Sequence, residues 1–288
     1  MSWVESLQRA IDYIERNLLN QDLSVEHVAK ACNSSVFHFQ RTFSILTDMT
    51  VGDYIRRRRL TLAAEELVNT DHKIIDIAYK YGYETPEAFT KAFRKQHQIA
   101  PRDARKKRGP LQSYNRLVIQ IKLEGAIPIN YKIIEKDAFQ VVGVKRTYNC
   151  QIGENLSGIP KFWEEAHLDG TNNRLVGLNN SEAAGILGVC IVEENQKSEG
   201  LMDYWIACAY EGVVPEGLET REIPASKWVV FEVHGAMPDA MQQTWKKIYS
   251  EWFPSNPYKP AGTAELEVYT NGNPSSPDYY SEIWIPIK

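Results

Sequence analysis

The sequence predicts two domains, an all-helical domain followed by an α+β domain with an antiparallel sheet. The length of 288 residues is comfortable for two domains. Apolar residues recur with the helical period over roughly the first hundred positions, whereas stretches such as Lys227–His234 alternate apolar and polar residues as strands do. Between the two patterns, the charged run Arg105–Arg108 is closed by Gly109 and Pro110, which is typical of a boundary. We therefore expect domains over residues 1–108 and 129–288, joined by a linker over 109–128.

Composition and charge limit the classes of protein that fit this chain. Hydrophobic residues make up 43% and charged residues 24%, which excludes a disordered or low-complexity protein. The net charge of −4 divides into +4 over residues 1–110 and −8 over residues 111–288, so an anionic partner is expected for the first half only. The longest nearly apolar run, residues 183–192, is too short for a bilayer, and no leader pattern opens the chain. We expect a cytoplasmic protein with no membrane partner and with reduced cysteines.

The first half begins with an amphipathic helix, whose apolar stripe extends from Trp3 to Leu18. A short helix, a tight turn and a second helix follow. Ser24 is a good N-cap for the short helix, Asn33 suits the left-handed conformation of a turn, and Ser35 caps the second helix. This layout is that of a helix-turn-helix unit. On its second helix, the residues expected to point inward are Phe39, Phe43 and Leu46, and those expected to point outward are Phe37, Gln40, Arg41 and Ser44.

The same layout recurs 50 residues later, after a long helix over Gly52–Val68. A short helix around Ile77 precedes Gly82, which tolerates the positive φ of a turn. Thr85 then caps a helix that starts at Pro86. On this helix Phe89 and Phe93 are expected to point inward, and Glu87, Thr90, Lys91 and Arg94 outward.

Two outward faces of this kind suit double-stranded DNA. Two helices on one rigid body reach successive major-groove segments roughly 34 Å apart. Arg41 suits a guanine edge, Gln40 an adenine edge, and Phe37 a thymine methyl group. Lys91 suits a base or a phosphate, and Arg56–Arg59 and Arg105–Arg108 are candidate phosphate contacts. The alternative is a helical bundle with solvated polar faces, and the tandem repeat favours DNA binding.

Residues 24–104 resemble the DNA-binding domain of the AraC/XylS family of transcription regulators. The pattern departs from the family at Asn33, where glycine is frequent, and at Ala104, where an aromatic residue is common. The resemblance implies that bases are read by Phe37, Gln40 and Arg41 in the first unit and by Glu87, Thr90 and Lys91 in the second. Glu87 and Lys91 also have the spacing of an i, i+4 ion pair. The resemblance is carried by Ala29, Ser35, Arg41, Phe43, Tyr54, Ile55, Arg59, Leu60, Ile77, Ala78, Gly82, Tyr83, Phe89, Phe93 and Pro101.

The second half is predicted to contain the order strand, helix, strand, strand, twice. Helices are expected around Phe162 and between Pro238 and Pro254. In the last strand the isoleucines share one face and Tyr280, Glu282 and Trp284 the other. A carboxylate flanked by aromatic rings suits a lipophilic cation, and the alternative is an exposed edge with a solvated glutamate. The strands are expected over Tyr131–Tyr148 (two strands), Gly185–Glu193, Asp203–Tyr210, Arg221–Gly235, Glu265–Tyr269 and Tyr279–Ile287.

Residues 129–288 look like the GyrI-like effector-binding domain. The resemblance implies a pocket for a small lipophilic or cationic effector, in which Glu282 meets the charge. Trp284, Tyr280, Trp228 and Tyr204 are the further candidates for this pocket. Some free-standing relatives resemble small-molecule hydrolases, so a hydrolase or a sequestering protein with secondary DNA binding stays the alternative. The resembling segments are Val142–Val144, Ile159–Trp163, Phe231–Gly235, Trp245–Tyr249, Glu265–Tyr269 and Glu282–Ile287.

The order of the two resemblances is similar to that of Rob-type regulators. We expect a non-enzymatic, sequence-specific transcription activator that binds promoter DNA and senses a small effector, with RNA polymerase as a candidate partner. No motif of a phosphate-binding loop, dinucleotide fold, metalloprotease or serine hydrolase occurs, and the six histidines lack metal-ligand spacing. Neither a cofactor nor a metal is therefore expected. The sequence leaves a monomer and a dimer both open.

Overall fold

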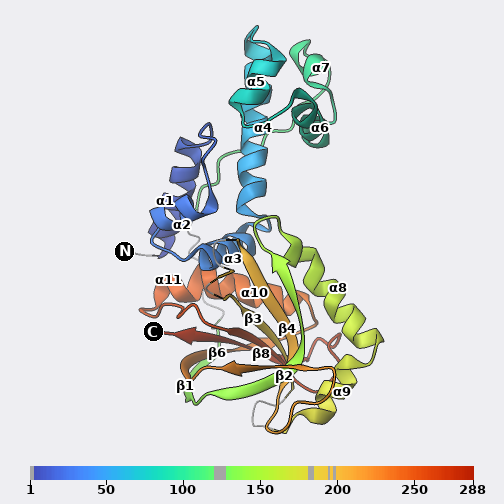
Figure 1. Ribbon diagram of the computed structural model, residues 1–288. Coiled ribbons are helices and arrows are strands. Elements are labelled where there is room, and N and C mark those ends of the chain that lie inside the picture. The colour runs from blue at the N-terminus through green and yellow to red at the C-terminus, as the bar shows by residue number, and fades with distance from the viewer. Residues whose placement is uncertain (1–2, 120–127, 181–184, 194, 197–198) are drawn as a thin grey trace. The chain divides into compact units, whose positions relative to one another are not determined.

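The contacts of the chain divide it into two compact units. The computed structural model describes residues 3–119, 128–180, 185–193, 195–196 and 199–288 (Figure 1). The first unit comprises residues 1–34 and 49–122, and the second comprises residues 35–48 and 123–288. The helix over Val36–Thr47 thus belongs by its contacts to the second unit, although its sequence lies among the helices of the first. The predicted domain boundaries stay predictions, and residues 120–127 of the predicted linker lie outside the described residues.

The first unit is helical, as predicted, and its helices begin where the sequence places their caps. The Ser24 side chain accepts a hydrogen bond from the His27 N–H, and the Thr85 side chain accepts one from the Ala88 N–H. Asn33 and Gly82 have φ angles of 54° and 83°, as the two tight turns require. The helices are α1 (Trp3–Arg16), α2 (Val25–Ala31), α4 (Val51–Asn69), α5 (Ile74–Lys80), α6 (Pro86–His97) and α7 (Pro101–Arg105).

The second helix-turn-helix unit is built on one apolar core. Phe89 and Phe93 of α6 are both fully buried, with ring centroids 5.5 Å apart. They pack with Leu60 and Leu67 of α4 and with Ile77 of α5. The inward stripe of α6 is therefore as predicted, and its burial leaves the opposite face of the helix to solvent.

The second unit is an eight-stranded antiparallel sheet with helices, which confirms the predicted α+β class. The strand order is β1-β6-β8-β7-β3-β4-β2-β5. Two details differ from the sequence prediction. An additional helix, α9, follows Gly170, and the predicted strand over Arg221–Gly235 is two strands separated at Pro224, which cannot donate a ladder hydrogen bond. The strands are β1 (Tyr131–Lys136), β2 (Phe139–Asn149), β3 (Ile186–Ile191), β4 (Leu201–Ala209), β5 (Glu219–Ile223), β6 (Ser226–His234), β7 (Glu265–Tyr269) and β8 (Tyr280–Ile287).

The helices of this unit cover one face of the sheet, which we call the helix face. Its core joins Phe162 and Leu175 of the helices to Tyr204 and Cys190 of the strands. The continuous helical segment near the C-terminus passes through Pro254 rather than stopping there, with a π-helical turn in its middle. The helices are α3 (Val36–Thr47), α8 (Glu154–Leu168), α9 (Thr171–Leu178), α10 (Asp239–Lys247), η1 (Ile248–Trp252) and α11 (Phe253–Ser255).

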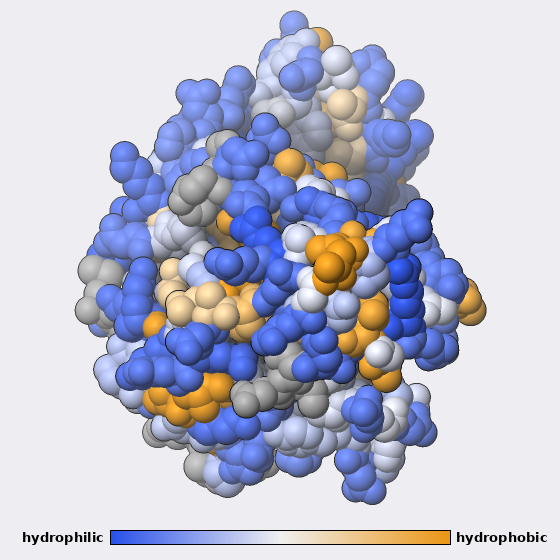
Figure 2. Space-filling model, turned by 60° about the horizontal axis from the view of Figure 1, so that its bottom comes forward, coloured by the Kyte–Doolittle hydropathy of each residue, from blue (hydrophilic) through white to orange (hydrophobic). Residues whose placement is uncertain are grey.

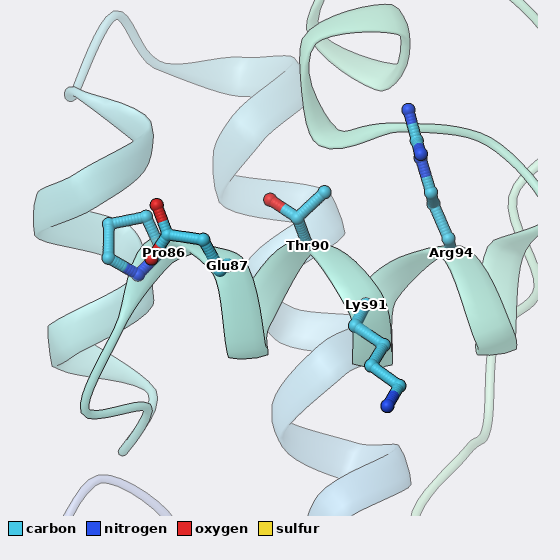
Figure 3. Close-up of a pocket in the computed structure, with 5 residues that line it drawn as sticks. All are labelled: Pro86, Glu87, Thr90, Lys91 and Arg94. Carbon is cyan, nitrogen blue, oxygen red and sulfur yellow. The ribbon is translucent and has the colours of Figure 1, made fainter.

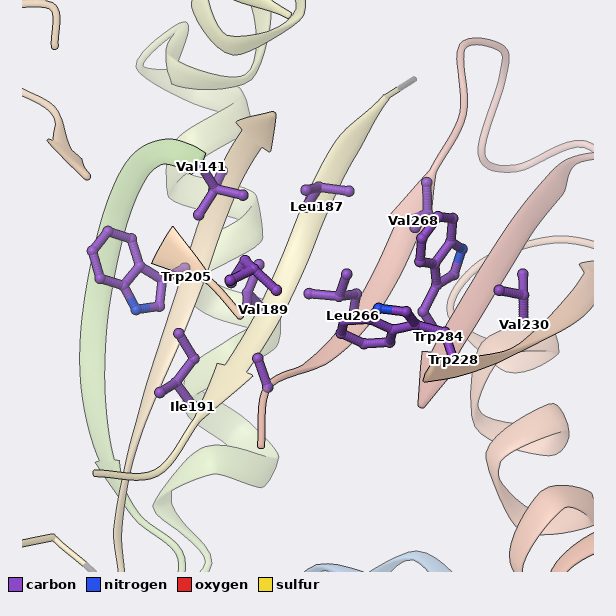
Figure 4. Packing of buried hydrophobic residues seen from close by; sticks show 13 residues of the cluster. Val141, Leu187, Val189, Ile191, Trp205, Trp228, Val230, Leu266, Val268 and Trp284 are labelled. Atoms are coloured by element: carbon purple, nitrogen blue, oxygen red, sulfur yellow. The ribbon is translucent and has the colours of Figure 1, made fainter. Parts of the chain in front are cut away.

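The opposite face, which we call the strand face, has an apolar cluster to which no described helix residue belongs. Trp228 and Trp284 meet edge to face with centroids 6.0 Å apart, and Leu266 and Val268 lie beside them (Figure 4). On the surface seen in Figure 2, apolar side chains lie in small separate patches among hydrophilic ones. Among the described residues, no helix has both the length and the apolar character needed to cross a membrane.

Candidate functional site

The outward face of α6 is exposed and polar. Glu87, Lys91 and Arg94 are exposed and Thr90 is half-buried, in agreement with the outward stripe expected from the sequence. Together with Pro86 these residues line an open hollow of about 430 Å³, from which Lys91 and Arg94 extend in different directions (Figure 3). In the described part of the chain no ion pair joins Glu87 to Lys91. Both charges are therefore available to an external partner.

The face of α3 that was expected to point outward is instead packed within the second unit. Gln40 is only 3% exposed, and neither its amide nitrogen nor its amide oxygen has a hydrogen-bond partner among the described residues. Phe37 packs against the core of the helix face. The outward expectation fails here because it left this face of α3 to solvent, whereas the face packs against other elements of the second unit.

Arg41 of α3 is held in an acidic and aromatic environment. Its Nε lies 2.5 Å from the Glu265 Oε2, and its side chain is 13% exposed. Its Nη1 donates to the Cys190 Sγ at 3.3 Å, and its guanidinium lies 4.5 Å from the centroid of the Trp245 ring. Burial alone would lower the pKa of Arg41, but the nearby acidic groups, Cys190 and Glu265 foremost, raise that pKa well above its ordinary value. Arg41 is therefore a fully charged guanidinium in a largely buried site.

A second carboxylate, Glu267, lies on the same face of β7 as Glu265. Its Oε1 accepts from the Trp245 Nε1–H at 2.9 Å, and its Oε2 accepts from the hydroxyls of Tyr204 at 3.1 Å and Tyr269 at 3.0 Å. The Trp163 Nε1–H in turn donates to the Tyr204 hydroxyl at 2.8 Å. Neutral donors thus satisfy Glu267, whereas Glu265 has a cationic partner.

Glu282 of β8 is surrounded as the sequence predicted. Its oxygens accept from the Tyr280 hydroxyl at 2.6 Å and from the Trp284 Nε1–H at 2.7 Å. Lys132 of β1, whose side chain is 56% exposed, adds a third hydrogen bond through its ammonium group, at 3.0 Å. Burial raises the pKa of Glu282, but these three hydrogen bonds outweigh it, so the pKa lies below its ordinary value. The exposed-edge alternative does not hold, because Glu282 is 8% exposed.

Four of the five predicted effector residues share the strand face. The register pairs Trp284 with Val230 and Pro286 with Trp228, so Tyr280, Glu282, Trp284 and Trp228 lie on one side. Tyr204 lies on the helix face with Glu267. The cluster around Glu265, Glu267, Trp245 and Tyr249 was not predicted as a site. Its signal was present in the segment Glu265–Tyr269, where two glutamates two positions apart must share a face of a strand.

The arginines of α4 are occupied within the first unit. Arg58 donates to Glu15 at 2.9 Å and to the Tyr114 carbonyl at 2.6 Å. Arg59 donates to the carbonyls of Leu18 and Asn20. These two side chains are therefore structural, whereas Arg56, 47% exposed, pairs only with Asp53 among the described residues.

Comparison with known proteins identifies both halves of the chain. The GyrI-like small molecule binding domain matches residues 129–288, and a helix-turn-helix domain matches residues 28–107. The chain belongs to the GyrI-like small-molecule-binding family. Its N-terminal part is a helix-turn-helix domain of the AraC type, so both resemblances predicted from the sequence are confirmed. The chain thus combines the DNA-binding domain of a transcription regulator with a GyrI-like small-molecule-binding domain.

The curated relatives match parts of the chain. Regulatory protein SoxS of Escherichia coli is 41% identical over 105 residues, which are 36% of this chain and 97% of SoxS. Right origin-binding protein of the same species is 33% identical over 152 residues, 51% of this chain and 52% of that protein. The chain spans 34% of the uncharacterized regulator YbfP of Bacillus subtilis, at 42% identity over 101 residues, 35% of this chain.

A solved structure of similar fold covers about half of the chain. The structure of SAV2435 bound to tetraphenylphosphonium aligns with a TM-score of 0.50 and 29% identity, over 55% of this chain and 94% of that one. The described residues of the present chain contain no group of three or more side chains arranged to hold a metal ion. Its four cysteines, Cys32, Cys150, Cys190 and Cys208, are free and buried.

Proposed function

We propose that the protein regulates transcription from specific promoters and that α6 reads bases in the major groove. The exposed polar face of α6 carries this proposal, because Lys91 and Arg94 extend from a helix whose other side is anchored in an apolar core. Thr90 and Glu87 are the further base-reading candidates on this helix. In the first unit of the tandem repeat, Phe37, Gln40 and Arg41 of α3 have the corresponding role when that helix engages DNA.

Fluorescence anisotropy with labelled DNA from upstream of the protein's own gene tests this proposal. Binding is expected to survive an excess of random competitor DNA and to weaken linearly with the logarithm of salt concentration. Lys91→Ala is expected to weaken binding by about tenfold, as loss of one base or phosphate contact does. Lys227→Ala, which removes the same charge from an exposed position of β6, is the matched control and should bind as wild type. Equal binding by Lys91→Ala and wild type would contradict the role of α6.

We further propose that the effector is a lipophilic cation. Support comes from two clusters of buried or half-buried carboxylates with aromatic neighbours. Glu282 lies with Tyr280, Trp284 and Trp228 on the strand face. Glu265 and Glu267 lie with Trp245 and Tyr249 on the helix face. A negative charge among aromatic rings attracts an organic cation both by Coulomb attraction and by cation–π contact. SAV2435, the neighbour of similar fold, was solved with tetraphenylphosphonium bound.

Calorimetric titration with tetraphenylphosphonium tests the effector class. Glu282→Gln keeps the shape of the side chain and removes its charge, so it should weaken cation binding if Glu282 meets the ligand. Glu222→Gln, at an exposed position of β5, is the control for the change in net charge. No binding to wild type would contradict a lipophilic cation as effector. We also propose that the protein activates transcription through RNA polymerase. Run-off transcription with and without the cation measures whether the cation raises or lowers the amount of transcript.

A further inference from the structure

The guanidinium of Arg41 occupies a carboxylate cluster that any other cation would have to share. We call this the β7 cluster and define it by Glu265, Glu267, Trp245, Tyr249 and Arg41. Glu265 is 4% exposed, and its only cationic partner among the described residues is Arg41. The Tyr249 hydroxyl donates to the other oxygen of Glu265 at 3.3 Å, and the Trp245 ring lies under the guanidinium. The cluster therefore already contains a cation on an aromatic ring beside a buried carboxylate.

The two carboxylates of the β7 cluster, Glu265 and Glu267, need a cation beside them because Glu265 is buried and Glu267 is half-buried. Glu265 and Glu267 are two positions apart on one face of β7, and Glu267 receives only neutral donors. With Arg41 in place the net charge of the cluster is −1, and without Arg41 the net charge is −2. A buried carboxylate without a cationic partner is strongly unfavourable, so departure of Arg41 favours entry of another cation.

The packing of α3 in the second unit buries the Gln40 side chain without hydrogen bonds to the described residues, and release of α3 would remove this unfavourable burial. Gln40 is 3% exposed in this arrangement, and its buried amide nitrogen and oxygen have no hydrogen bond among the described residues. A buried amide without partners is unfavourable, whereas the same amide in water or at a base edge is satisfied. Gln40 therefore opposes the docking that Arg41 stabilises, which brings the docked and released states of α3 closer in free energy.

Arg41 cannot pair with Glu265 and read a base at the same time. We propose that Arg41 is a tethered cation that holds α3 in the second unit through Glu265, and that a lipophilic cation entering the β7 cluster replaces it and frees α3 for DNA. This rests on the proposed function for its effector class and its DNA-reading role. It adds the site of the effector, which it places at Glu265 on the helix face and not at Glu282 on the strand face, so that the Glu265 carboxylate pairs with either Arg41 or the effector.

The tether is tested without any effector by Glu265→Gln in the full chain. This variant keeps the shape of the side chain and removes the charge that holds Arg41. Hydrogen exchange of the amides over residues 36–47 is expected to accelerate about tenfold, and affinity for cognate DNA to rise by a similar factor, because the released state is more populated. Unchanged exchange and unchanged DNA affinity would overturn the tether.

Glu165→Gln is the matched control for this experiment. Glu165 also pairs with an arginine, Arg146, at 2.5 Å, and the Arg146 guanidinium also lies over a ring, that of Phe162, at 4.3 Å. Both partners are about half exposed and neither belongs to α3, so the exchange of residues 36–47 should not change.

Replacement is tested by calorimetric titration of tetraphenylphosphonium into wild type and Arg41→Ala. Removing the tethered cation is expected to tighten binding about tenfold, because the ligand no longer competes with Arg41. Arg146→Ala should bind as wild type. Equal affinity of wild type and Arg41→Ala overturns replacement while leaving the proposed effector class intact. Absence of binding in both overturns the effector class and replacement together, and the hydrogen-exchange result then decides the tether by itself.

Discussion

At the scale of single residues, Gly188 provides the space in which Tyr204 reaches Glu267. A Cβ at position 188 would lie 2.3 Å from the Tyr204 hydroxyl oxygen and 3.1 Å from the Glu267 Oε2. Gly188→Ala is therefore expected to break the bond between the Tyr204 hydroxyl and Glu267 and to lower the free energy of unfolding of the second unit by about 1–3 kcal/mol. Urea denaturation followed by tryptophan fluorescence measures this change.

Gly177 provides the control for this substitution. A Cβ there meets nothing within 4 Å, and the residue lies in α9. Gly177→Ala should therefore leave the unfolding free energy unchanged or raise it by up to about 1 kcal/mol, because alanine favours the helix. If Gly188→Ala and Gly177→Ala lowered the free energy of unfolding equally, the space at Gly188 would not be what keeps Tyr204 bonded to Glu267.

His38 makes the packing of α3 dependent on pH. Burial, and then the charge of Arg41, lower the pKa of His38 from 6.5 to about 4, and the His38 ring lies 5.8 Å from the Tyr249 ring. Packing thus favours the neutral ring, and its contribution to stability is full above pH 6.5, declines as the pH falls from 6.5 to 4, and stays level below that. Hydrogen exchange of residues 36–47, corrected for intrinsic rates, should accelerate over this range. The acceleration should be smaller in His38→Gln, and an identical pH profile in both proteins would rule out this role.

At the scale of elements, α1 and α4 are joined by a largely buried ion pair. Arg58 and Glu15 are 12% and 11% exposed, and the Tyr54 hydroxyl also donates to Glu15 at 2.6 Å. Burial raises the pKa of Glu15, but hydrogen bonds from Arg58 and Tyr54 outweigh it and lower the pKa overall. Arg58→Ala leaves this carboxylate without its cation and should cost about 2–4 kcal/mol in the unfolding of the first unit.

Circular dichroism during urea denaturation measures the loss of helix in this test. Arg56→Ala is its control, because Arg56 lies on the same helix and pairs with Asp53 at 2.6 Å, but both partners are more exposed. A loss of at most about 0.5 kcal/mol is expected for that pair. If the two substitutions had equal effects, the pair between α1 and α4 would not be a significant stabilising contact.

The elements that the sequence predicts well are those defined by neighbouring residues. Ser24, Ser35 and Thr85 begin their helices at the predicted positions, because an N-cap acts within three residues. The predictions fail where the local pattern is ambiguous. No helix is predicted from the sequence over Thr171–Leu178, which form α9, and the strand expected across Pro224 is divided into β5 and β6.

At the scale of the whole molecule, the sites depend on contacts that no local pattern contains. The cluster around Glu282 was predictable because Tyr280, Glu282 and Trp284 are neighbours on one strand. The β7 cluster was not, since the pair of Arg41 with Glu265 joins α3 to a strand near the other end of the chain. Tyr204 lies on the helix face, apart from the other four candidate effector residues, because its face is fixed by the register of β4 with β3.

The membership of α3 in the second unit has a consequence for how the full chain binds DNA. In the proposed arrangement, while Glu265 holds Arg41, α6 is the one of the two proposed reading helices whose candidate side chains are exposed, so we expect few phosphate contacts. Release of α3 should add contacts, and each phosphate contact changes the slope of log K against log salt by about −0.9. Glu265→Gln should therefore bind with a slope steeper by about 2 units or more, and protect a longer stretch of DNA from nuclease.

Lys91→Ala distinguishes the steeper salt dependence expected from release of α3 from a general change in DNA affinity. Lys91 lies on α6, which in the proposed arrangement engages DNA in both states, so its loss should reduce the slope by about 1 unit in wild type and in Glu265→Gln alike. A slope and a protected length that do not differ between wild type and Glu265→Gln would mean that α3 already reads DNA in the resting protein. The ion pair of Arg41 with Glu265 would then be broken in every DNA complex, with or without effector.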